Sequence, residues 1–185
     1  MSVISNEAAN LAIGNIARYG DTDIFPFPIE NRMFFDNAGE VKKILLEIDG
    51  DFQKAIADIP IVKSNNLSAV GYGGFRWGAQ IDPVWNAYLL ALTLTIANDL
   101  EVCRVPSTVV FSYRFKPDLT TFSLFSKDIG WLQFKEKSID EARSHEYMMR
   151  CDISDFYPRI YHHRLENALR ETLQNLPHPA NATRA

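Results

Sequence analysis

The sequence predicts an α+β fold, and three observations support this expectation. Apolar residues recur at helical spacing through much of residues 1–60. Short runs that alternate apolar and polar residues, as strands do, follow between residues 107 and 134. Near the C-terminal end, residues 147–153 have the composition of a buried strand and lead into an amphipathic helix expected over residues 159–175.

The composition is that of a folded protein. The chain has 185 residues, of which 46% are hydrophobic and 12% aromatic, enough to bury a core. Its net charge of -4 does not favour nucleic-acid binding by overall charge, because phosphate contacts favour a basic surface. Lysines and arginines nevertheless occur along residues 63–164, in the segment that leads into Asp152 and surrounds it, which gives weak support for such a partner.

Cysteine usage and hydropathy indicate the compartment. Cys103 and Cys151 both lie in apolar runs, so we expect two buried thiols in a reducing cytosol rather than a disulfide or a metal site. The N-terminus has no basic-then-apolar signal sequence. The apolar stretch at residues 87–97 is shorter than the roughly 20 residues that a bilayer-spanning helix needs. We therefore expect a cytoplasmic protein without a membrane partner.

The N-terminal third is expected to be mainly helical. Residues 6–19 place their apolar side chains on one stripe, which predicts a short amphipathic helix. Alternate prolines then predict an extended segment at residues 21–28, whose two phenylalanines can anchor on a core. A second helix is expected over residues 40–59, with a kink at Gly50.

Glycines, an aspartate and a proline define the next elements. Three glycines surround Tyr72 in a turn-rich stretch at residues 65–74. They could cradle a phosphate, but the stretch lacks the lysine-serine ending of a Walker loop, which favours a flexible hairpin tip. Asp82 can cap a helix and Pro83 suits its first turn, so we expect a long buried helix over residues 83–100.

Three short runs predict a small antiparallel sheet, at residues 107–115, 120–125 and 129–134. In the first run, Tyr113 and Arg114 allow two interpretations. They could form an exposed pair that stacks on nucleotides. A core position for the tyrosine and a solvent-exposed arginine is the favoured interpretation. A short polar helix or loop should follow at residues 138–145.

Asp152 stands where the expected strand at residues 147–153 ends. At the end of a strand, a sheet can present a charged side chain to a cleft without burying that charge. Asp152 is therefore the first candidate for a catalytic residue, and Asp155 is the second. On position alone, an aspartate at a strand end is more often a turn former or a helix cap than a metal ligand. His162 and His163 point about 100° apart on a helix, which favours a surface role.

Three stretches of the chain resemble reverse transcriptases. The string DISDFYPRIYHH at residues 152–163 resembles the first catalytic motif of their palm, most closely that of the bacterial antiviral-defence, abortive-infection type. The string GDTDIFPFPIE at residues 20–30 resembles the N-terminal extension of the same proteins. Arg76, followed by an apolar residue five positions on, a proline and a buried helix, resembles their fingers motif.

This resemblance implies the N-terminal part of a right-hand polymerase. Residues 1–60 would be a helical N-terminal extension, residues 61–145 a fingers-like region, and residues 146–185 the start of the palm, with its first strand and helix. The implied function is RNA-directed DNA synthesis in bacterial anti-phage defence. The implied partners are an RNA template, a DNA product and deoxynucleoside triphosphates.

The resemblance also assigns roles to individual residues. It makes Asp152 the catalytic Mg²⁺ ligand, with the backbone carbonyl of Ile153 as a second ligand. Tyr157 matches the aromatic that packs under the sugar and excludes a ribose 2′-hydroxyl, and Arg76 matches the arginine that contacts the triphosphate. A salt-bridged or stacked surface role remains an alternative for Arg76. The residues expected in the core beside Tyr157 are Phe156 and Ile160.

One feature of the family is missing from these residues. A complete palm carries an aromatic-x-Asp-Asp hairpin, and the sequence contains no Asp-Asp dipeptide. Because Asp152 alone cannot hold two Mg²⁺ ions, we expect the chain to be inactive by itself and to need the remaining palm and thumb or self-association. The alternative is a non-catalytic nucleic-acid-binding or interaction module derived from a reverse transcriptase.

Overall fold

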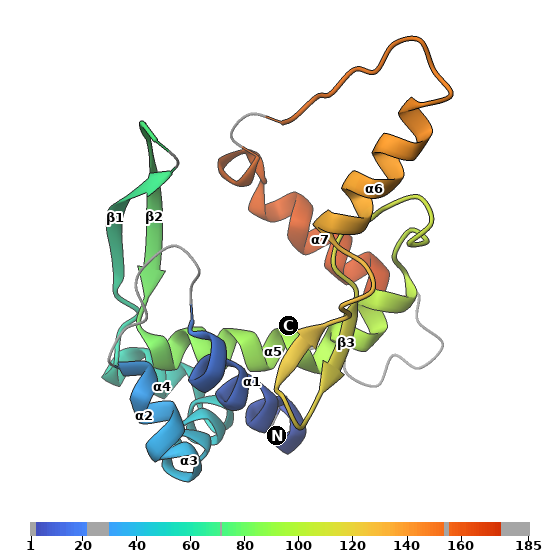
Figure 1. The fold of residues 1–185 in the computed structure, drawn as a ribbon. Helices are drawn as coiled ribbons and strands as arrows, with labels where there is room; N and C mark the ends of the chain where they lie inside the picture. Colours follow the sequence, from blue (N-terminus) through green and yellow to red (C-terminus); the bar gives the residue numbers. More distant parts are fainter. Residues whose placement is uncertain (1–2, 22–29, 71, 154–155, 175–185) are drawn as a thin grey trace. The chain divides into compact units, whose positions relative to one another are not determined.

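Residues 3–21, 30–70, 72–153 and 156–174 are described in this computed structural model, whose elements are drawn in Figure 1. Helices and two small two-stranded sheets make the chain α+β, as the sequence predicts. The chain divides into two units. Unit 1 comprises Met1–Ile96 and Pro117–Leu124, and unit 2 comprises Ala97–Lys116 and Phe125–Ala185.

Helix α1 (Asn6–Tyr19) has the bounds that its sequence predicts. The Ser5 hydroxyl accepts a hydrogen bond from the Ala8 N–H at 3.0 Å, which caps the first turn. Gly20 ends the helix with a φ of 87°, a left-handed value that glycine adopts without strain. The apolar stripe of α1 is buried and forms much of the core of unit 1.

Three further helices complete the N-terminal part of unit 1. They are α2 (Glu30–Asp36), α3 (Ala38–Gly50) and α4 (Phe52–Asp58). The kinked helix expected over residues 40–59 is thus two helices, separated at Asp51. The Asp51 carboxylate caps α4 by accepting the Lys54 N–H at 3.1 Å. Helix α2 was not predicted from the sequence.

A buried carboxylate joins three segments of unit 1. Asp49, on the last turn of α3, is only 8% exposed. It accepts hydrogen bonds from the N–H groups of Val3 and Ile4, the latter at 3.1 Å, and from the Tyr88 hydroxyl at 3.1 Å. Burial, together with the charge and hydrogen bond of Asp49, raises the pKa of Tyr88.

Strands β1 (Lys63–Val70) and β2 (Gly74–Ile81) form an antiparallel hairpin with Lys63 opposite Ile81. The hairpin tip was predicted, but the expectation of turns from residue 65 onward was wrong. Asparagines and serines are poor strand formers, and their pairing with β2 stabilises the strand despite that weak preference. Local sequence therefore could not reveal β1.

Helix α5 (Pro83–Val102) confirms the predicted long helix and its capping residue. The Asp82 carboxylate accepts the Val84 N–H at 2.9 Å. Only part of the helix is buried, since Leu89 is 54% exposed, so the expectation of an interior helix was too strong. In the part of the chain that the structure describes, no helix is both long enough and apolar enough to cross a membrane.

The second sheet is smaller than the sequence predicts. It contains β3 (Phe115–Asp118) and β4 (Ser123–Phe125), and residues 107–114 form no strand. The expected strand at 129–134 was wrong because helix α6 (Trp131–Ala142) begins within it. The helix or loop expected over residues 138–145 is confirmed, as the last part of α6 and the turn after it. The Trp131 and Phe134 rings of α6 stack one turn apart at 5.4 Å.

The turn between β3 and β4 packs on α1. Phe122 has a φ of 54°, unusual for a residue with a side chain, and its carbonyl accepts the Asn15 Nδ2–H at 2.8 Å. The Tyr19 hydroxyl donates to the Thr121 carbonyl at 3.0 Å. The Phe122 ring lies against Gly14, where a methyl group would overlap it. A helical glycine thus makes room for an aromatic ring.

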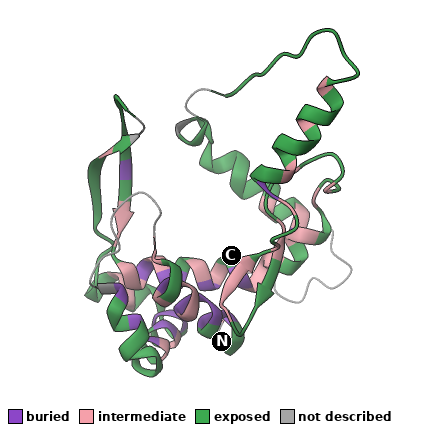
Figure 2. Ribbon diagram, in the orientation of Figure 1, coloured by how far each residue is buried: buried purple, intermediate pink, exposed green. Residues whose placement is uncertain are grey.

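Burial differs sharply between the two units, as Figure 2 shows. Among the described residues, the buried hydrophobic side chains lie in unit 1, with the single exception of Leu173. In unit 2, large apolar side chains of α6 and of residues 147–161 are exposed. Unit 2 therefore presents apolar surface of the kind that a partner polypeptide covers in other proteins.

Candidate functional site

The segment that leads to Asp152 is not the buried strand that its composition predicts. Residues 147–153 have no regular secondary structure. Tyr147 is 84% and Met149 86% exposed. No backbone hydrogen bond joins this segment to another described part of the chain. The prediction was wrong for a physical reason, since an apolar strand needs a neighbouring strand to pair with.

Asp152 itself is exposed, and its carboxylate is available for a ligand. One carboxylate oxygen accepts the N–H of the next residue, Ile153, at 2.8 Å. Among the described residues, Asp152 forms no ion pair. The second oxygen can therefore bind a metal ion without breaking an ion pair. The other candidate, Asp155, lies outside the described residues.

Tyr157 begins the short helix η1 (Tyr157–Arg159), which precedes α7 (His162–Gln174). The helix predicted over residues 159–175 is confirmed as α7, but it begins three residues later than expected, and η1 is a separate turn before it. Tyr157 is 79% exposed, and its ring meets that of Phe156 edge to face at 5.4 Å.

Phe156 and Ile160 were predicted to lie in the core beside Tyr157, and this prediction was wrong. Phe156 is 50% and Ile160 36% exposed. Both side chains belong to an apolar surface that unit 2 does not cover with described residues. His162 and His163 are exposed, as predicted.

An apolar groove lies directly before Asp152 in unit 2. It has a volume of about 680 Å³ and runs between α6 and residues 147–151. The Arg150 guanidinium lies over the Trp131 ring at 5.9 Å, which connects the two sides. Cys151 is exposed, and so is Cys103, so the expectation of two buried thiols was wrong.

The donor set that these residues offer to Mg²⁺ is incomplete. Asp152 and the Ile153 carbonyl are oxygen donors of the kind that Mg²⁺ prefers. The described residues contain no group of three or more His, Cys, Asp or Glu side chains that could hold a metal ion. One carboxylate and one carbonyl do not fit a two-metal centre, so further carboxylates are required for that chemistry.

Arg76 lies on β2 in unit 1, whereas Asp152, Ile153 and Tyr157 belong to unit 2. It is exposed and stands opposite Ser68 in the hairpin register. No carboxylate among the described residues pairs with Arg76. Within the described part of the chain, its guanidinium therefore meets no carboxylate that would compete with an anionic ligand.

Unit 2 contains an ionic cluster around Glu101 that no pattern in the sequence predicted. The side chain of Arg114 is only 12% exposed and its Nη1 lies 3.0 Å from Glu101 Oε1, so its expected solvent-exposed role was wrong. Arg104 and the N–H of Phe115 donate to Glu101 Oε2 at 2.9 and 3.0 Å. Partial burial opposes ionisation, but these hydrogen bonds prevail and lower the pKa of Glu101.

The ionic cluster is structural rather than nucleotide-binding. Glu101 lies in the last turn of α5, and its three donors hold the loop that follows against that helix. Tyr113 is 57% exposed, not in the core, and packs on the Phe125 ring at 5.5 Å. A glutamate thirteen residues before an arginine carries no local pattern, so sequence spacing could not indicate the pair.

The chain matches no protein-family model, no curated protein and no solved structure. The reverse-transcriptase resemblance therefore rests on the motif residues themselves, above all on Asp152, Tyr157 and Arg76.

Proposed function

We propose that this chain is the N-terminal part of a reverse transcriptase of bacterial anti-phage defence, consisting of the helical extension, the fingers and the first palm motif. It acts in the cytoplasm on an RNA template and deoxynucleoside triphosphates. Asp152 and the Ile153 carbonyl contribute to Mg²⁺ binding, Tyr157 is the sugar gate and Arg76 contacts the triphosphate. The remaining carboxylates come from a further palm and thumb.

The observation that carries this proposal is the combination of an exposed carboxylate with uncovered apolar surface. Asp152 ends an apolar segment whose side chains and backbone have no partner strand among the described residues. Exposing such a segment is unfavourable, at about 25 cal/mol for each Å² of apolar area. A neighbouring palm strand would cover the segment and bring further carboxylates to Asp152.

The proposed chemistry assigns a distinct task to each residue. Together with the further carboxylates, Asp152 would hold Mg²⁺ through the carboxylate oxygen that does not accept the Ile153 N–H. The ion would supply the positive charge that this reaction needs near the 3′-hydroxyl and the triphosphate. Tyr157 presents a large ring five residues after Asp152, where its bulk excludes a 2′-hydroxyl by contact. Arg76 offers planar donors suited to phosphate oxygens.

The proposal is tested by RNA-templated primer extension. The chain is combined with a palm and thumb polypeptide that carries the aromatic-x-Asp-Asp hairpin of a defence-type reverse transcriptase. Asp152→Ala should lower the rate of deoxynucleotide incorporation by about a thousandfold or more, as expected for loss of a metal ligand. Asp140→Ala is the matched control, because Asp140 is an exposed carboxylate of unit 2 whose one ion-pair partner among the described residues is Arg143. Equal rates for the two variants would contradict the proposal.

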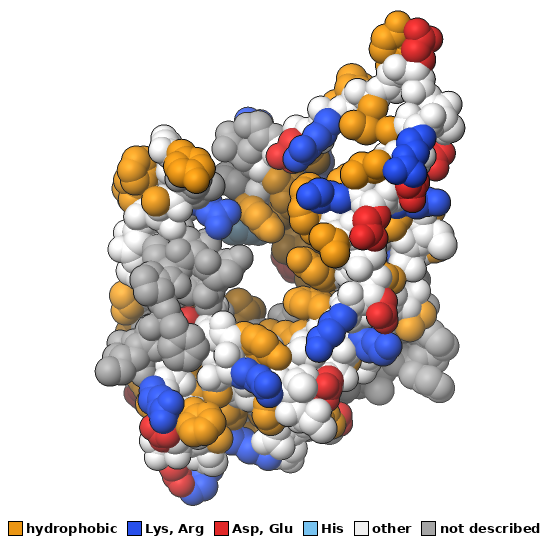
Figure 3. All heavy atoms as spheres, in the orientation of Figure 1, with side chains coloured by type: hydrophobic (Ala, Val, Ile, Leu, Met, Phe, Trp, Pro, Cys, Tyr) orange, Lys and Arg blue, Asp and Glu red, His pale blue; other side chains and the backbone are white. Residues whose placement is uncertain are grey.

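A second candidate function, binding of single-stranded nucleic acid without catalysis, is favoured by the β1–β2 hairpin. Cross-strand partners share a face, so Leu67 and Trp77 lie on one face, together with Phe75. These side chains are 53%, 75% and 69% exposed. Figure 3 shows hydrophobic side chains on the outer end of the hairpin. Arg76 lies on the opposite face.

Trp77→Ala tests whether the hairpin binds nucleic acid by stacking on bases, because the substitution removes an aromatic ring and leaves every charge in place. Base stacking on an aromatic ring contributes about 1–3 kcal/mol per base, so the variant should bind single-stranded RNA at least about fivefold more weakly. Fluorescence anisotropy of a labelled oligoribonucleotide measures this affinity. Trp131→Ala, which removes an exposed tryptophan from α6, should leave it unchanged. Equal losses in both variants would rule out a stacking surface on the hairpin.

A further inference from the structure

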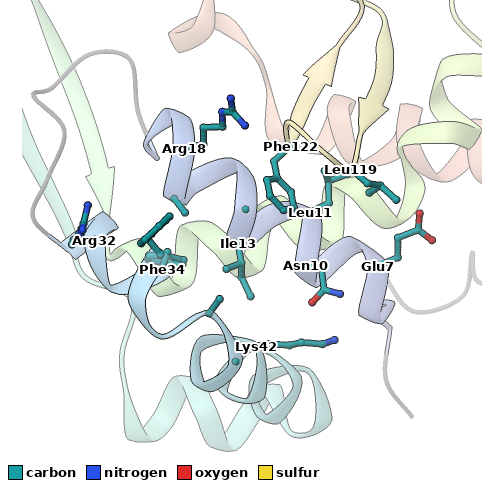
Figure 4. A pocket seen from close by; sticks show the side chains of 15 residues that line it. Glu7, Asn10, Leu11, Ile13, Arg18, Arg32, Phe34, Lys42, Leu119 and Phe122 are labelled. Carbon is teal, nitrogen blue, oxygen red and sulfur yellow. The ribbon is translucent and has the colours of Figure 1, made fainter.

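Unit 1 contains a hollow that the proposed polymerase function does not use. It has a volume of about 1000 Å³ and is formed by α1, α2, α3 and the β3–β4 turn. Figure 4 shows Leu11, Ile13 and Phe34 among the side chains that line it, with Phe122 from the turn. Binding sites for small molecules commonly occupy about 300–1,000 Å³, so the hollow is large enough for an organic ligand.

The cationic residues of the lining come from three different helices. Arg18 belongs to α1, Arg32 to α2 and Lys42 to α3. Glu7 is the one acidic residue of the lining, so the charge there is positive. Among the described residues, neither Arg18 nor Lys42 forms an ion pair, and Arg32 pairs only with the exposed Asp36 at 3.5 Å.

The apolar part of the lining restricts the chemistry of the ligand. It consists of aliphatic and aromatic side chains and of glycine and alanine, without hydroxyl or amide groups apart from Asn10. A nucleobase or a peptide backbone buried there would lose hydrogen bonds to water without replacing them. A hydrocarbon chain loses none, and it gains from leaving water.

We propose that this hollow binds a single-chain amphipathic anion, either a long-chain carboxylate or an alkyl phosphate. The hydrocarbon chain lies on the apolar lining, and the anionic head meets one of the cations at the rim, where Arg18, Arg32 and Lys42 lie at separate points (Figure 4). Guanidinium groups bind both carboxylates and phosphates with paired hydrogen bonds. This binding is independent of Asp152 and of the proposed polymerase.

Two glycines of α3 allow the site to be blocked without disturbing the fold. A Cβ added at Gly39 or at Gly50 meets no atom within 4 Å. Gly39 lines the hollow, whereas Gly50, at the other end of the same helix, does not. Gly39→Leu therefore places a bulky side chain in the hollow, and Gly50→Leu is the matched control for the change in size and helix preference.

The test is isothermal titration of the full chain with dodecanoate below its micelle concentration, with dodecanol as the uncharged probe. The wild-type chain should bind dodecanoate more tightly than dodecanol. Gly39→Leu should weaken binding of both probes about tenfold or more, and Gly50→Leu should leave it unchanged. At least one of Arg32→Gln and Lys42→Gln should weaken binding of dodecanoate about threefold, in keeping with an exposed charge pair, and neither should affect binding of dodecanol. Far-UV circular dichroism confirms that each variant is folded.

Three outcomes would overturn the proposal. Absence of dodecanoate binding to the wild-type chain would show that the hollow is not such a site. Equal affinity for dodecanoate and dodecanol would show that the cations do not select an anion. Unchanged binding in Gly39→Leu, or an equal loss in Gly50→Leu, would place the ligand elsewhere on the chain.

Discussion

Asp49→Ala should lower the free energy of unfolding of unit 1 by about 3 kcal/mol or more. The substitution removes the acceptor of the Val3 and Ile4 N–H groups and of the Tyr88 hydroxyl, and each buried donor left unsatisfied costs about 1–3 kcal/mol. Urea unfolding followed by circular dichroism measures the loss. Tyr88→Phe removes one of these hydrogen bonds and should cost about 1 kcal/mol. A loss no larger than that of Tyr88→Phe would contradict the central role of Asp49.

The same contact predicts a dependence on pH. Because burial and Asp49 raise the pKa of Tyr88 above its unfolded value of about 10, the neutral hydroxyl contributes stability below that pH. This contribution is lost as the pH rises above about 10, since the unfolded chain then releases its proton more readily. In Tyr88→Phe this alkaline loss should disappear. If the free energy of unfolding of Tyr88→Phe falls above about pH 10 as it does in the wild-type chain, groups other than Tyr88 cause the loss of stability.

Gly14→Ala should destabilise unit 1 by about 2 kcal/mol, although alanine is the better helix former by about 1 kcal/mol. The added methyl group would overlap the Phe122 ring, which two hydrogen bonds between the turn and α1 keep in place. Gly39→Ala, in α3, is the control, because its methyl group meets no atom within 4 Å and should be neutral or stabilising.

The overlap is verified by a double-mutant cycle, again with urea unfolding. In a Phe122→Ala background, Gly14→Ala should no longer destabilise, because the ring that it meets is gone. If Gly14→Ala costs the same with and without Phe122, the close approach of the turn to α1 is not the cause.

Elements with strong local signals were predicted well. Helix α1 has a serine cap and a terminal glycine, and α5 begins with Asp82 and Pro83, so the bounds of both could be predicted closely. Strand β1 has no such signal, because its asparagines and serines are held by pairing with β2. Contacts between distant segments, such as Phe122 on Gly14 or Arg114 on Glu101, have no local pattern at all.

At the candidate site too, local sequence patterns did not predict what depends on contacts between distant segments. Composition predicted an apolar segment before Asp152, and the segment is apolar, but a strand forms only where another strand pairs with it. The exposure of Asp152 and Tyr157 agrees with a site open to ligands. The roles of these residues come from the resemblance and stay predictions, because no spacing within the chain defines a complete metal centre.

The most direct measurement compares Mg²⁺-dependent deoxynucleotide incorporation on an RNA template by three samples. These are the chain alone, the complementary palm and thumb alone, and the two combined. The proposed function predicts incorporation only in the combined sample, since Asp152 and the Asp-Asp hairpin must meet to hold two metal ions. Incorporation by the chain alone, or none from a combined sample in which the two polypeptides form a complex, would contradict it.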